Sequence, residues 1–529
     1  MLRKWKVFVV LLILLAVLTS CGEKITDGNT IAVSNHQNGL VLPLDDKGTE
    51  ISILCESNHT NLQDSLIVKE LSKRTGVYVK IVAVPRSIYN EKARVLLASK
   101  SEMPDIFRGG FDIGGLNLYE INDFAMQGAF EPINPHIGQL PNFKEIFVEK
   151  AEEYGTQRMF SDYSAPDGML YVFPRYHTDR QVNHGILYRK DIFDGLGIPM
   201  WNNKEEFYQA LKTVKAAYPE SQPFTTKWGI TFFQQIGQSW GIDFPDVYFE
   251  EETGLWKHSA ADEKLKEMLD YLRRLYDEKL LDKEFLTNTE SQWTSKMTAR
   301  SSSFVTFDWI GRLDAFYDSV KDTNPSYDLR YGNPIGPTGK VITLPAVNEG
   351  PAIKKSKKSL LAMQLCDYLL SLEGAELITL GIPGVTYEIG EDGFADYYGF
   401  EEGKAISIQN LEEKYGLFIP GMYRRFDERS IYFNFTEKEQ EAQNLMANKP
   451  GGGFLPEDPM VSLTNEEREI VNDKNNRIMK EAEEFVSKYI LTEHTGDEAW
   501  NAWIARAHQL GVDEVVQCYQ AAQKRYEQN

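Results

Sequence analysis

Three stretches of the sequence place aromatic rings beside charged or amide side chains. They are residues 171–175, 238–243 and 306–312, and each follows a pattern that is typical of a strand end. Flat rings pack against the C–H faces of a pyranose, while carboxylates and guanidinium groups hydrogen-bond its hydroxyls or the carboxylate of an acidic sugar. Ordinary core packing explains any one of these rings equally well. The three stretches are therefore candidate sugar contacts.

A fourth stretch matches a catalytic motif but lacks its context. Residues 237–241 read Gly-Gln-Ser-Trp-Gly, the G-x-S-x-G pattern of a serine nucleophile at a strand-to-helix turn. A helix must follow such a turn at once, whereas Pro245 lies four residues after the motif and cannot stand inside a helix. The sequence also lacks the spacings of zinc sites and of phosphate-binding loops. We expect no catalytic residues, no metal and no cofactor.

The candidate contacts belong to a chain in which strand and helix patterns alternate. A strand pattern at residues 51–54, a helical pattern at residues 61–74 and a β-branched run at residues 77–84 form a βαβ unit. Strands joined by such a crossover lie parallel in one sheet, which predicts an α/β fold. Further strands are expected at residues 105–107, 171–174, 185–189 and 302–307, and further helices at residues 89–99, 121–128, 204–218, 260–278, 356–370, 372–380, 465–489 and 497–510. In open α/β sheets ligands bind beyond the carboxyl ends of the strands, where the candidate contacts fall.

Length and charge limit the classes of protein that this chain can be. Its 529 residues exceed the size at which a single core stops growing, about 250–300 residues, so two lobes are expected. The net charge of −21 argues against nucleic acid as a partner, because phosphate backbones need a basic surface.

The first twenty residues read as an export signal. Three basic residues precede an unbroken apolar run at residues 7–18, which is shorter than the roughly 20 residues that a membrane-spanning helix needs. Residues 18–22, Leu-Thr-Ser-Cys-Gly, form the lipobox pattern of bacterial lipoproteins, in which Cys21 is acylated and becomes the first residue after cleavage. An ordinary secretory signal with a chance cysteine is the alternative. Residues 21–48 are polar and are predicted to be a flexible tether.

The other cysteines, Cys55, Cys366 and Cys518, lie far apart in apolar patterns, so we expect buried thiols. A disulfide between Cys55 and Cys366 is the alternative.

The order and spacing of many short motifs resemble one family, the extracellular solute-binding proteins of family 1. Its LplA-like members are lipoproteins of bacterial carbohydrate ABC importers. The resemblance covers the chain from about residue 50 to its end. Its motifs are Met-Pro-Asp-Ile-Phe at residues 103–107, Gly-Ala-Phe-Glu-Pro-Ile at 128–133, Asp-Gly-Met-Leu-Tyr-Val-Phe-Pro at 167–174, Leu-Tyr-Arg-Lys-Asp at 187–191, Leu-Gly-Ile-Pro at 196–199, Asp-Tyr-Leu-Leu-Ser-Leu-Glu-Gly at 367–374, and Gly-Ile-Pro-Gly-Val-Thr-Tyr at 381–387.

The resemblance implies a type II periplasmic-binding-protein fold, in which two α/β lobes joined by a hinge close on a ligand. Lobe one would comprise residues 49–180 and 334–382, and lobe two residues 181–333 and 383–529, with extra C-terminal helices. The resemblance also implies ligand-binding residues: Trp240 and Trp309 as stacking rings, Asp308 and Arg312 as their polar neighbours, Tyr171 and Arg175 near the hinge, and Asp112 and Tyr387 as further candidates. Many members carry a calcium loop after the helix at residues 204–218. Here residues 219–226 differ from that loop, so no calcium is expected.

The function that the resemblance implies is that of a lipid-anchored receptor on the outer face of the cell membrane. As a monomer, it would capture an oligosaccharide and deliver it to ABC permease subunits without catalysis. An acidic sugar is a candidate ligand if the arginines line the cleft; these are Arg175, Arg180, Arg312, Arg424 and Arg425. The alternatives are a peptide receptor of the same fold, a lipid-anchored glycoside hydrolase using two carboxylates, and an adhesion or sensory lipoprotein.

Overall fold

The expected βαβ unit opens the fold. In the computed structural model, β1 (Glu50–Glu56) pairs in parallel with β2 (Tyr78–Val84) along its whole length. The connecting helix α2 (Leu66–Thr75) begins at Ser65, whose side chain accepts a hydrogen bond from a backbone N–H of the first turn. It ends at Gly76, which has a φ of 72° that a larger residue would adopt only under strain. Ser65 and Gly76 therefore fix the two ends of the helix that joins the parallel strands.

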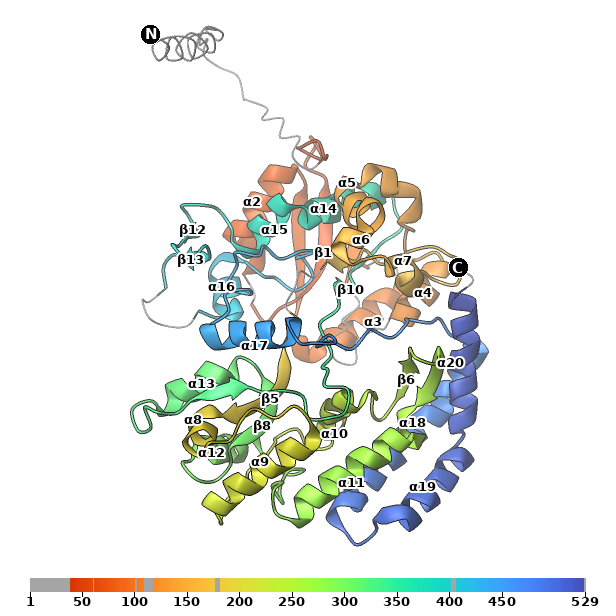
Figure 1. Cartoon of the computed structure of the whole chain (residues 1–529). Coiled ribbons are helices and arrows are strands. Elements are labelled where there is room, and N and C mark those ends of the chain that lie inside the picture. Colours follow the sequence, from red (N-terminus) through yellow and green to blue (C-terminus); the bar gives the residue numbers. More distant parts are fainter. Residues whose placement is uncertain are drawn as a thin grey trace, which may run out of the picture. The chain divides into compact units, whose positions relative to one another are not determined.

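The structure describes residues 39–59, 61–99, 102–108, 118–176, 181–400 and 406–527. The predicted signal peptide, Cys21, most of the tether, Asp112 and Arg180 lie outside these residues. Asn38–Asn529 form one compact unit, and Figure 1 shows its elements in two groups. Among the described residues, no helix combines the length and the apolar character that crossing a membrane requires.

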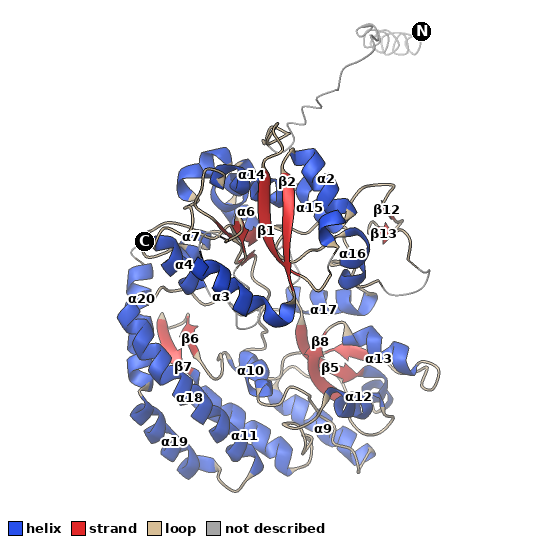
Figure 2. Ribbon diagram, turned by 180° about the vertical axis from the view of Figure 1, so that it is seen from behind, coloured by secondary structure: helices blue, strands red, loops and turns tan. Residues whose placement is uncertain are grey.

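Lobe one is built on a four-stranded sheet in which the strands lie in the order β11-β3-β1-β2. The adjacent strands β11, β3 and β1 come from distant parts of the chain. Strand β3 lies parallel to β1, while β11 closes the sheet in the antiparallel direction. The elements of lobe one are the strands β1, β2, β3 (Ile106–Phe107), β4 (Arg175–Tyr176), β10 (Val347–Asn348), β11 (Ala352–Ile353), β12 (Tyr387–Ile389) and β13 (Ala395–Tyr397) and the helices α2, α3 (Tyr89–Ser99), α4 (Leu118–Met126), α5 (Pro141–Lys144), α6 (Ala151–Tyr154), α7 (Met159–Tyr163), α14 (Ser359–Leu370), α15 (Leu372–Thr379) and α16 (Ile408–Tyr415). Helices cover this sheet, as Figure 2 shows for β1 and β2.

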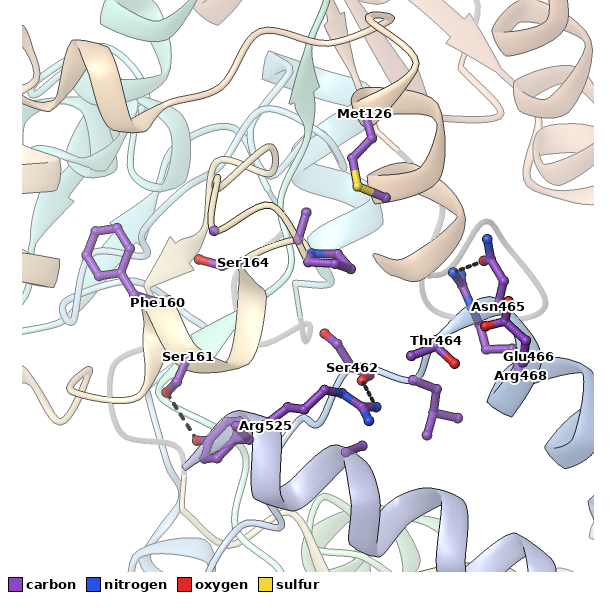
Figure 3. A pocket seen from close by; sticks show the side chains of 16 residues that line it. Met126, Phe160, Ser161, Ser164, Ser462, Thr464, Asn465, Glu466, Arg468 and Arg525 are labelled. Carbon is purple, nitrogen blue, oxygen red and sulfur yellow. Dashed lines mark hydrogen bonds between the residues drawn. The ribbon is translucent and has the colours of Figure 1, made fainter. Parts of the chain in front are cut away.

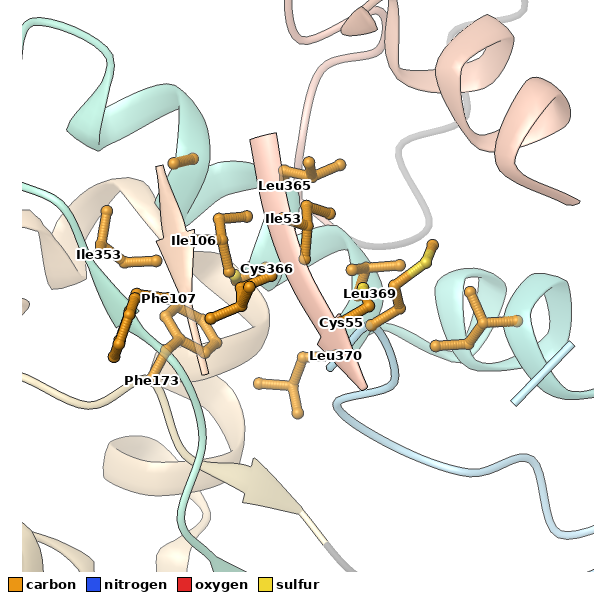
Figure 4. Packing of buried hydrophobic residues seen from close by; sticks show 14 of the residues in the cluster. Ile53, Cys55, Ile106, Phe107, Phe173, Ile353, Leu365, Cys366, Leu369 and Leu370 are labelled. Atoms are coloured by element: carbon orange, nitrogen blue, oxygen red, sulfur yellow. The ribbon is translucent and has the colours of Figure 1, made fainter. Parts of the chain in front are cut away.

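The core of lobe one joins the sheet to helix α14. Ile53 of β1, Phe107 of β3 and Leu369 of α14 are at most 1% exposed and belong to one apolar cluster (Figure 4). Burial of each such side chain contributes about 1.5–3 kcal/mol. Cys55 and Cys366 lie in the same cluster as free thiols, so the two cysteines are not joined.

Lobe two is built on the antiparallel sheet β8-β5-β9. Successive residues of β5 face opposite sides of this sheet, so Ile186 and Tyr188 enter one apolar cluster and Leu187 enters another. The elements of lobe two are the strands β5 (His184–Arg189), β6 (Val247–Glu250), β7 (Leu255–His258), β8 (Val305–Trp309) and β9 (Leu329–Tyr331) and the helices α8 (Lys190–Gly195), α9 (Lys204–Ala217), α10 (Thr231–Gly237), α11 (Glu263–Asp277), α12 (Glu290–Thr298), α13 (Arg312–Val320), α17 (Glu437–Ala447), α18 (Asn465–Leu491), α19 (Gly496–Leu510) and α20 (Val512–Tyr526). The C-terminal helices α18 and α19 lie beside α11 in both views (Figures 1 and 2).

The chain passes from one lobe's core to the other between Tyr176 and Val182, between Val341 and Val347, and between Phe433 and Phe435. The lobe-one ends of the first two passages lie side by side, because β4 pairs with β10 in the antiparallel direction. A fourth segment lies against both lobes, since Met460 packs on the core of lobe one and its neighbour Val461 belongs to the core of lobe two. These segments are where any movement between the lobes would have to be absorbed.

One segment packs with a different lobe from the one that we expected. Tyr387, Leu411 and Phe433 are buried in the core of lobe one, and the hydroxyl of Tyr397 donates a 2.7 Å hydrogen bond to the carbonyl of Thr379 in α15. The sequence analysis assigned residues 383–433 to lobe two, because an apolar pattern predicts burial but not the core in which a residue is buried. We propose that lobe one comprises residues 39–176 and 347–433, and lobe two residues 182–341 and 435–527.

Candidate functional site

The carboxyl end of β8 in the lobe-two sheet gathers the first group of candidate residues. Phe224 forms a parallel bridge with Val305 at the start of β8. Because the two segments run in the same direction, Lys227 and Trp228 leave the sheet at the same edge as Asp308 and Trp309.

The indole rings at this edge form a supported platform. Trp309 is 40% exposed, the largest exposure among the predicted stacking rings. Its ring lies over Gly311, where an added Cβ would come within 2.2 Å of the ring. The indole of Trp228 is held in place by its Nε1, which donates a 3.0 Å hydrogen bond to the carbonyl of Phe307. A sugar face can therefore stack on Trp309 with little rearrangement of the protein.

The charged groups next to Trp309 in this part of the lobe pair with one another. Asp308 is 2% exposed, and its Oδ2 lies 3.2 Å from Lys227 Nζ and 3.5 Å from Arg312 Nε. Arg312 also donates a 2.6 Å hydrogen bond to Glu290. The structure thus brings together Trp309, Asp308 and Arg312, as the sequence analysis expected. It adds Lys227 and Trp228, which that analysis missed because the buried segment before them lacks the alternating pattern of a strand.

Lobe one contributes a polar cavity of about 320 Å³, which we call the arginine pocket. Its walls include three guanidinium groups, two phenol rings and one carboxylate, from Arg108, Arg175, Arg424, Tyr163, Tyr423 and Glu349. Arg108 directly follows β3, and Arg175 begins β4. The pocket therefore lies at the carboxyl end of the parallel strands of lobe one, where α/β folds bind ligands.

The guanidinium groups of the arginine pocket differ in how their charge is balanced. Arg108 pairs with Glu56 at 3.1 Å. Arg424 is 3% exposed and donates hydrogen bonds to the carbonyls of Tyr423 and Gly421, while Arg175 lies 5.2 Å from the centre of the Tyr423 ring. Within the part of the chain that the structure describes, neither Arg175 nor Arg424 forms an ion pair, and the Nε of each is buried without a hydrogen-bond partner. Burial lowers the pKa of Arg424, and the charges of its arginine neighbours lower it further.

A second cavity, of about 420 Å³, lies between the lobes and adjoins the arginine pocket at Tyr163. Its walls combine residues 155–163 of lobe one, Asp243 and Tyr248 of lobe two and the passages at residues 342–347 and 455–460. Burial raises the pKa of Asp243 to about 6. The two cavities share Tyr163 as a wall, so they are neighbouring parts of the candidate site.

A larger cavity of about 650 Å³ lies where the C-terminal helices meet lobe one (Figure 3). Its two arginines already have partners: Arg468 donates a 2.9 Å hydrogen bond to Asp123, and Arg525 donates a 3.0 Å hydrogen bond to Glu467. These cations balance the charge of the protein itself, so the larger cavity is not the candidate site.

Three predicted ligand contacts lie inside the lobes and correct our expectation. Trp240 is 1% exposed, with its ring 5.8 Å from that of Tyr271 in the core of lobe two. Tyr171 and Tyr387 are 7% and 2% exposed, and their hydroxyls donate to Asp167 and Glu376 at 2.8 Å and 2.9 Å. An aromatic residue beside a polar one looks the same in sequence whether its ring faces a cleft or a core. Of the other candidates, Arg175 lines the arginine pocket, and Asp112 lies outside the described residues.

The serine of the G-x-S-x-G match is held as a structural residue. Ser239 lies in a short 3₁₀ turn (Gln238–Trp240) that follows helix α10, and not after a strand. Its hydroxyl donates to the carbonyl of Ile236 at 2.9 Å and accepts from the N–H of Gly336 at 3.1 Å. This arrangement is not a nucleophile elbow, which needs an exposed serine between a strand and a helix.

The sequence profile of the family described as bacterial extracellular solute-binding protein matches residues 59–376. The chain belongs to this family. The expected family is thereby confirmed, and the family is one of solute-binding proteins, in agreement with the expectation that the chain is not an enzyme.

Two relatives and one solved structure extend the comparison. The fructooligosaccharide ABC transporter substrate-binding protein FusA of Streptococcus pneumoniae serotype 4 is 27% identical over 338 residues, 60% of this chain and 58% of the relative. The polygalacturonan/rhamnogalacturonan-binding protein YtcQ of Bacillus subtilis (strain 168) is 22% identical over 412 residues, 74% of this chain and 75% of the relative. The alginate-binding protein AlgQ2, in a crystal structure without calcium ion, superposes with a TM-score of 0.67 at 22% identity, covering 91% of this chain and 99% of AlgQ2. The expected α/β solute-binding fold is confirmed.

Proposed function

We propose that this solute-binding protein is the substrate-binding component of a bacterial ABC importer and holds an oligosaccharide between its two lobes. The observation that carries the proposal is the supported, 40% exposed ring of Trp309 at the carboxyl end of β8 in the lobe-two sheet. Exposed indoles are favoured where an apolar sugar face must be bound in water. The names of FusA and YtcQ support the class of ligand, since both describe carbohydrate binding.

Capture requires that the ligand touch both lobes. Lobe two offers Trp309, and lobe one offers the arginine pocket, so a ligand that spans them binds the closed arrangement more strongly than the open one. A ligand shifts such an equilibrium only by its difference in affinity for the two states. The closed form then docks on membrane permease subunits, and the protein itself performs no chemistry.

The protein reaches the membrane through its N-terminal segment. We propose that residues 1–20 are a signal peptide, that Cys21 carries the lipid, and that residues 21–48 tether a monomer to the outer face of the cell membrane. The described residues are consistent with attachment by lipid, because none of their helices is long and apolar enough to span a membrane.

A thermal-shift screen tests the proposal. The chain without residues 1–21, which retains the whole compact unit, is heated with neutral oligosaccharides, uronate-containing oligosaccharides and short peptides. A ligand at 100 times its Kd stabilises the folded state by about 2.7 kcal/mol. We expect a saturable shift with an oligosaccharide that is recovered unchanged. A shift with peptides alone would contradict the proposal, and cleavage of the glycan would show an enzyme instead.

A further inference from the structure

We infer that the arginine pocket is a subsite for a single carboxylate group of an acidic sugar. This inference rests on the proposed function, because it assumes that an oligosaccharide occupies the cleft, and it names the acidic class of that ligand.

The arginine pocket contains buried positive charge. Arg424 is 3% exposed, and a guanidinium group remains protonated at neutral pH even when burial lowers its pKa. A buried charge is destabilising unless an opposite charge compensates it. Within the described residues, its guanidinium group donates to two backbone carbonyls, which carry only partial charge. An anion supplied by a ligand would provide that compensation.

The charges of the side chains that line the pocket indicate that one anion would bind there. Arg108 is matched by Glu56, which leaves Arg175 and Arg424 against the single carboxylate of Glu349. The thiol of Cys366 contacts Arg424 but does not balance it, because burial raises the pKa of that thiol to about 11 and keeps it neutral. Counted over these described side chains, the remaining charge of the pocket is about +1, which one carboxylate neutralises.

The donors in the pocket suit a carboxylate. The Nε atoms of Arg175 and Arg424 are both buried, and neither has a hydrogen-bond partner. Guanidinium groups bind carboxylates through planar forks, and such charge-assisted hydrogen bonds are about twice as strong as neutral ones. Within the described residues, the pocket is thus lined by two cations whose hydrogen-bonding capacity is not fully used.

The backbone around the pocket is closely packed, so the donors are held in place. Gly350 lies against the carbonyl of Phe173, where an added Cβ would come within 1.6 Å of the oxygen. Gly421 has a φ of 103°, and its added Cβ would come within 2.8 Å of the carbonyl of Leu54. Only glycine permits these approaches, and they bring the segments that carry Arg424 and Glu349 against the end of the sheet.

The position of the pocket favours a sugar acid over a free anion. The pocket shares Tyr163 as a wall with the cavity of about 420 Å³ between the lobes. A small anion would fill only the pocket, whereas a uronate residue can place its carboxylate there while the rest of the oligosaccharide lies along the cleft. Sites of about 300–1,000 Å³ are typical of small ligands. Two proteins that are similar to this chain, YtcQ and AlgQ2, have names that describe binding of polymers of sugar acids, a polygalacturonan and alginate.

Calorimetric titration with matched ligands tests the inference. The chain without residues 1–21 is titrated with galacturonate oligosaccharides, with mannuronate and guluronate oligosaccharides, and with the methyl esters of each, which keep the sugar and remove the charge. Inorganic phosphate and acetate serve as free anions. We expect at least one acid to bind at least tenfold more tightly than its methyl ester, and the free anions to compete only weakly.

Variants connect this preference to the pocket. Arg175→Gln removes one of the two uncompensated charges and is expected to abolish the preference for the acid while binding of the methyl ester persists. Arg477→Gln is the matched control, because this exposed arginine pairs with Asp473 on α18. The control is expected to keep the full preference. Arg424→Lys keeps the charge but loses the planar fork, so an intermediate preference is expected, with the melting temperature reporting whether each variant is folded.

The outcomes separate this inference from the proposed function. Tight binding of neutral oligosaccharides with no preference for any acid over its ester would overturn the carboxylate subsite and leave the proposed function standing. A preference that survives Arg175→Gln and Arg424→Lys in folded protein would also overturn it. If no glycan binds at all, the proposed function itself fails. Selective binding of peptides with a free C-terminus over amidated ones would assign the pocket to a peptide carboxylate.

Discussion

The hydroxyl of Tyr526, near the end of the last helix, donates a 2.8 Å hydrogen bond to the carboxylate of Asp162 in lobe one. Arg158 reinforces this contact, since it pairs with Asp162 at 3.3 Å and donates to the carbonyls of Glu457 and Asp458 at 2.8 Å and 2.6 Å. The last helix of lobe two is thus attached to lobe one by a contact that is separate from the β4 and β10 passages and joins two residues far apart in the sequence.

Removal of the Tyr526 hydroxyl is expected to weaken this attachment. Tyr526→Phe deletes the hydrogen bond to Asp162 and is expected to lower the free energy of unfolding by about 0.5–1.5 kcal/mol in urea titrations. If the contact exists only in one arrangement of the lobes, ligand affinity changes as well, by no more than the same amount. Tyr398→Phe is the control, because the hydroxyl of Tyr398 donates a 3.0 Å hydrogen bond to Glu388 within lobe one. An equal change of affinity in both variants would contradict a role between the lobes.

The two tryptophans that the sequence suggested as stacking residues are expected to behave in opposite ways. Trp309 is 40% exposed, so Trp309→Ala is expected to leave the melting temperature nearly unchanged and to weaken oligosaccharide binding at least tenfold. Trp240 is 1% exposed, so Trp240→Ala is expected to lower stability by about 3–5 kcal/mol through the cavity that it leaves. Melting curves and calorimetric titrations measure both effects. A Trp309→Ala variant that binds the oligosaccharide with unchanged affinity would contradict a stacking role for Trp309.

The contrast between these tryptophans shows what the sequence could predict. Local signals predicted the βαβ unit: the strand pattern at residues 51–54, the helical pattern at residues 61–74 and the β-branched run that forms β2. The residues around Trp309 were predicted as a group because β8 holds them next to one another in sequence. The strand expected at residues 171–174 is present only as an isolated bridge from Val172 to Ala352.

Long-range relationships could not be predicted in the same way. The arginine pocket brings together Arg108, Arg175 and Arg424, which are spread over more than three hundred residues of the sequence. No periodicity of the sequence connects them. Sequence patterns likewise could not tell that residues 383–433 return to the core of lobe one. Both features depend on the packing of loops whose conformations are set by tertiary contacts.

The buried cysteines are expected to be unreactive in the folded protein. Burial raises the pKa of Cys55 to about 12 and that of Cys366 to about 11, so the reactive thiolate is scarce at pH 8. In the chain without residues 1–21, we expect a thiol reagent to modify these two residues only after denaturation, as mass spectrometry of labelled peptides would show. Rapid labelling of the native protein at either residue, or a disulfide between them, would contradict this packing.

Asp243 is expected to make stability depend on pH. Burial raises its pKa to about 6, above the value of about 3.9 that an unfolded chain gives. The folded state therefore binds a proton more tightly, and the stability associated with this proton is present at acid pH and is lost as the pH rises through 6. Asp243→Asn removes the charge and keeps an acceptor for Gln234. Melting temperatures are expected to show the variant more stable than the native chain at pH 7.5, by a margin that shrinks toward pH 5. A margin that is constant or grows on acidification would contradict this.

The central claim is that one ligand touches the carboxyl edges of both lobes. Hydrogen–deuterium exchange, measured with and without a saturating oligosaccharide found in the thermal-shift screen, tests it most directly. The account predicts that the ligand slows exchange both in lobe two, at residues 225–229 and 306–312, and in lobe one, at residues 421–425, while the cavity wall at residues 462–468 is unaffected. Protection confined to one lobe, or protection centred on residues 462–468, would contradict it.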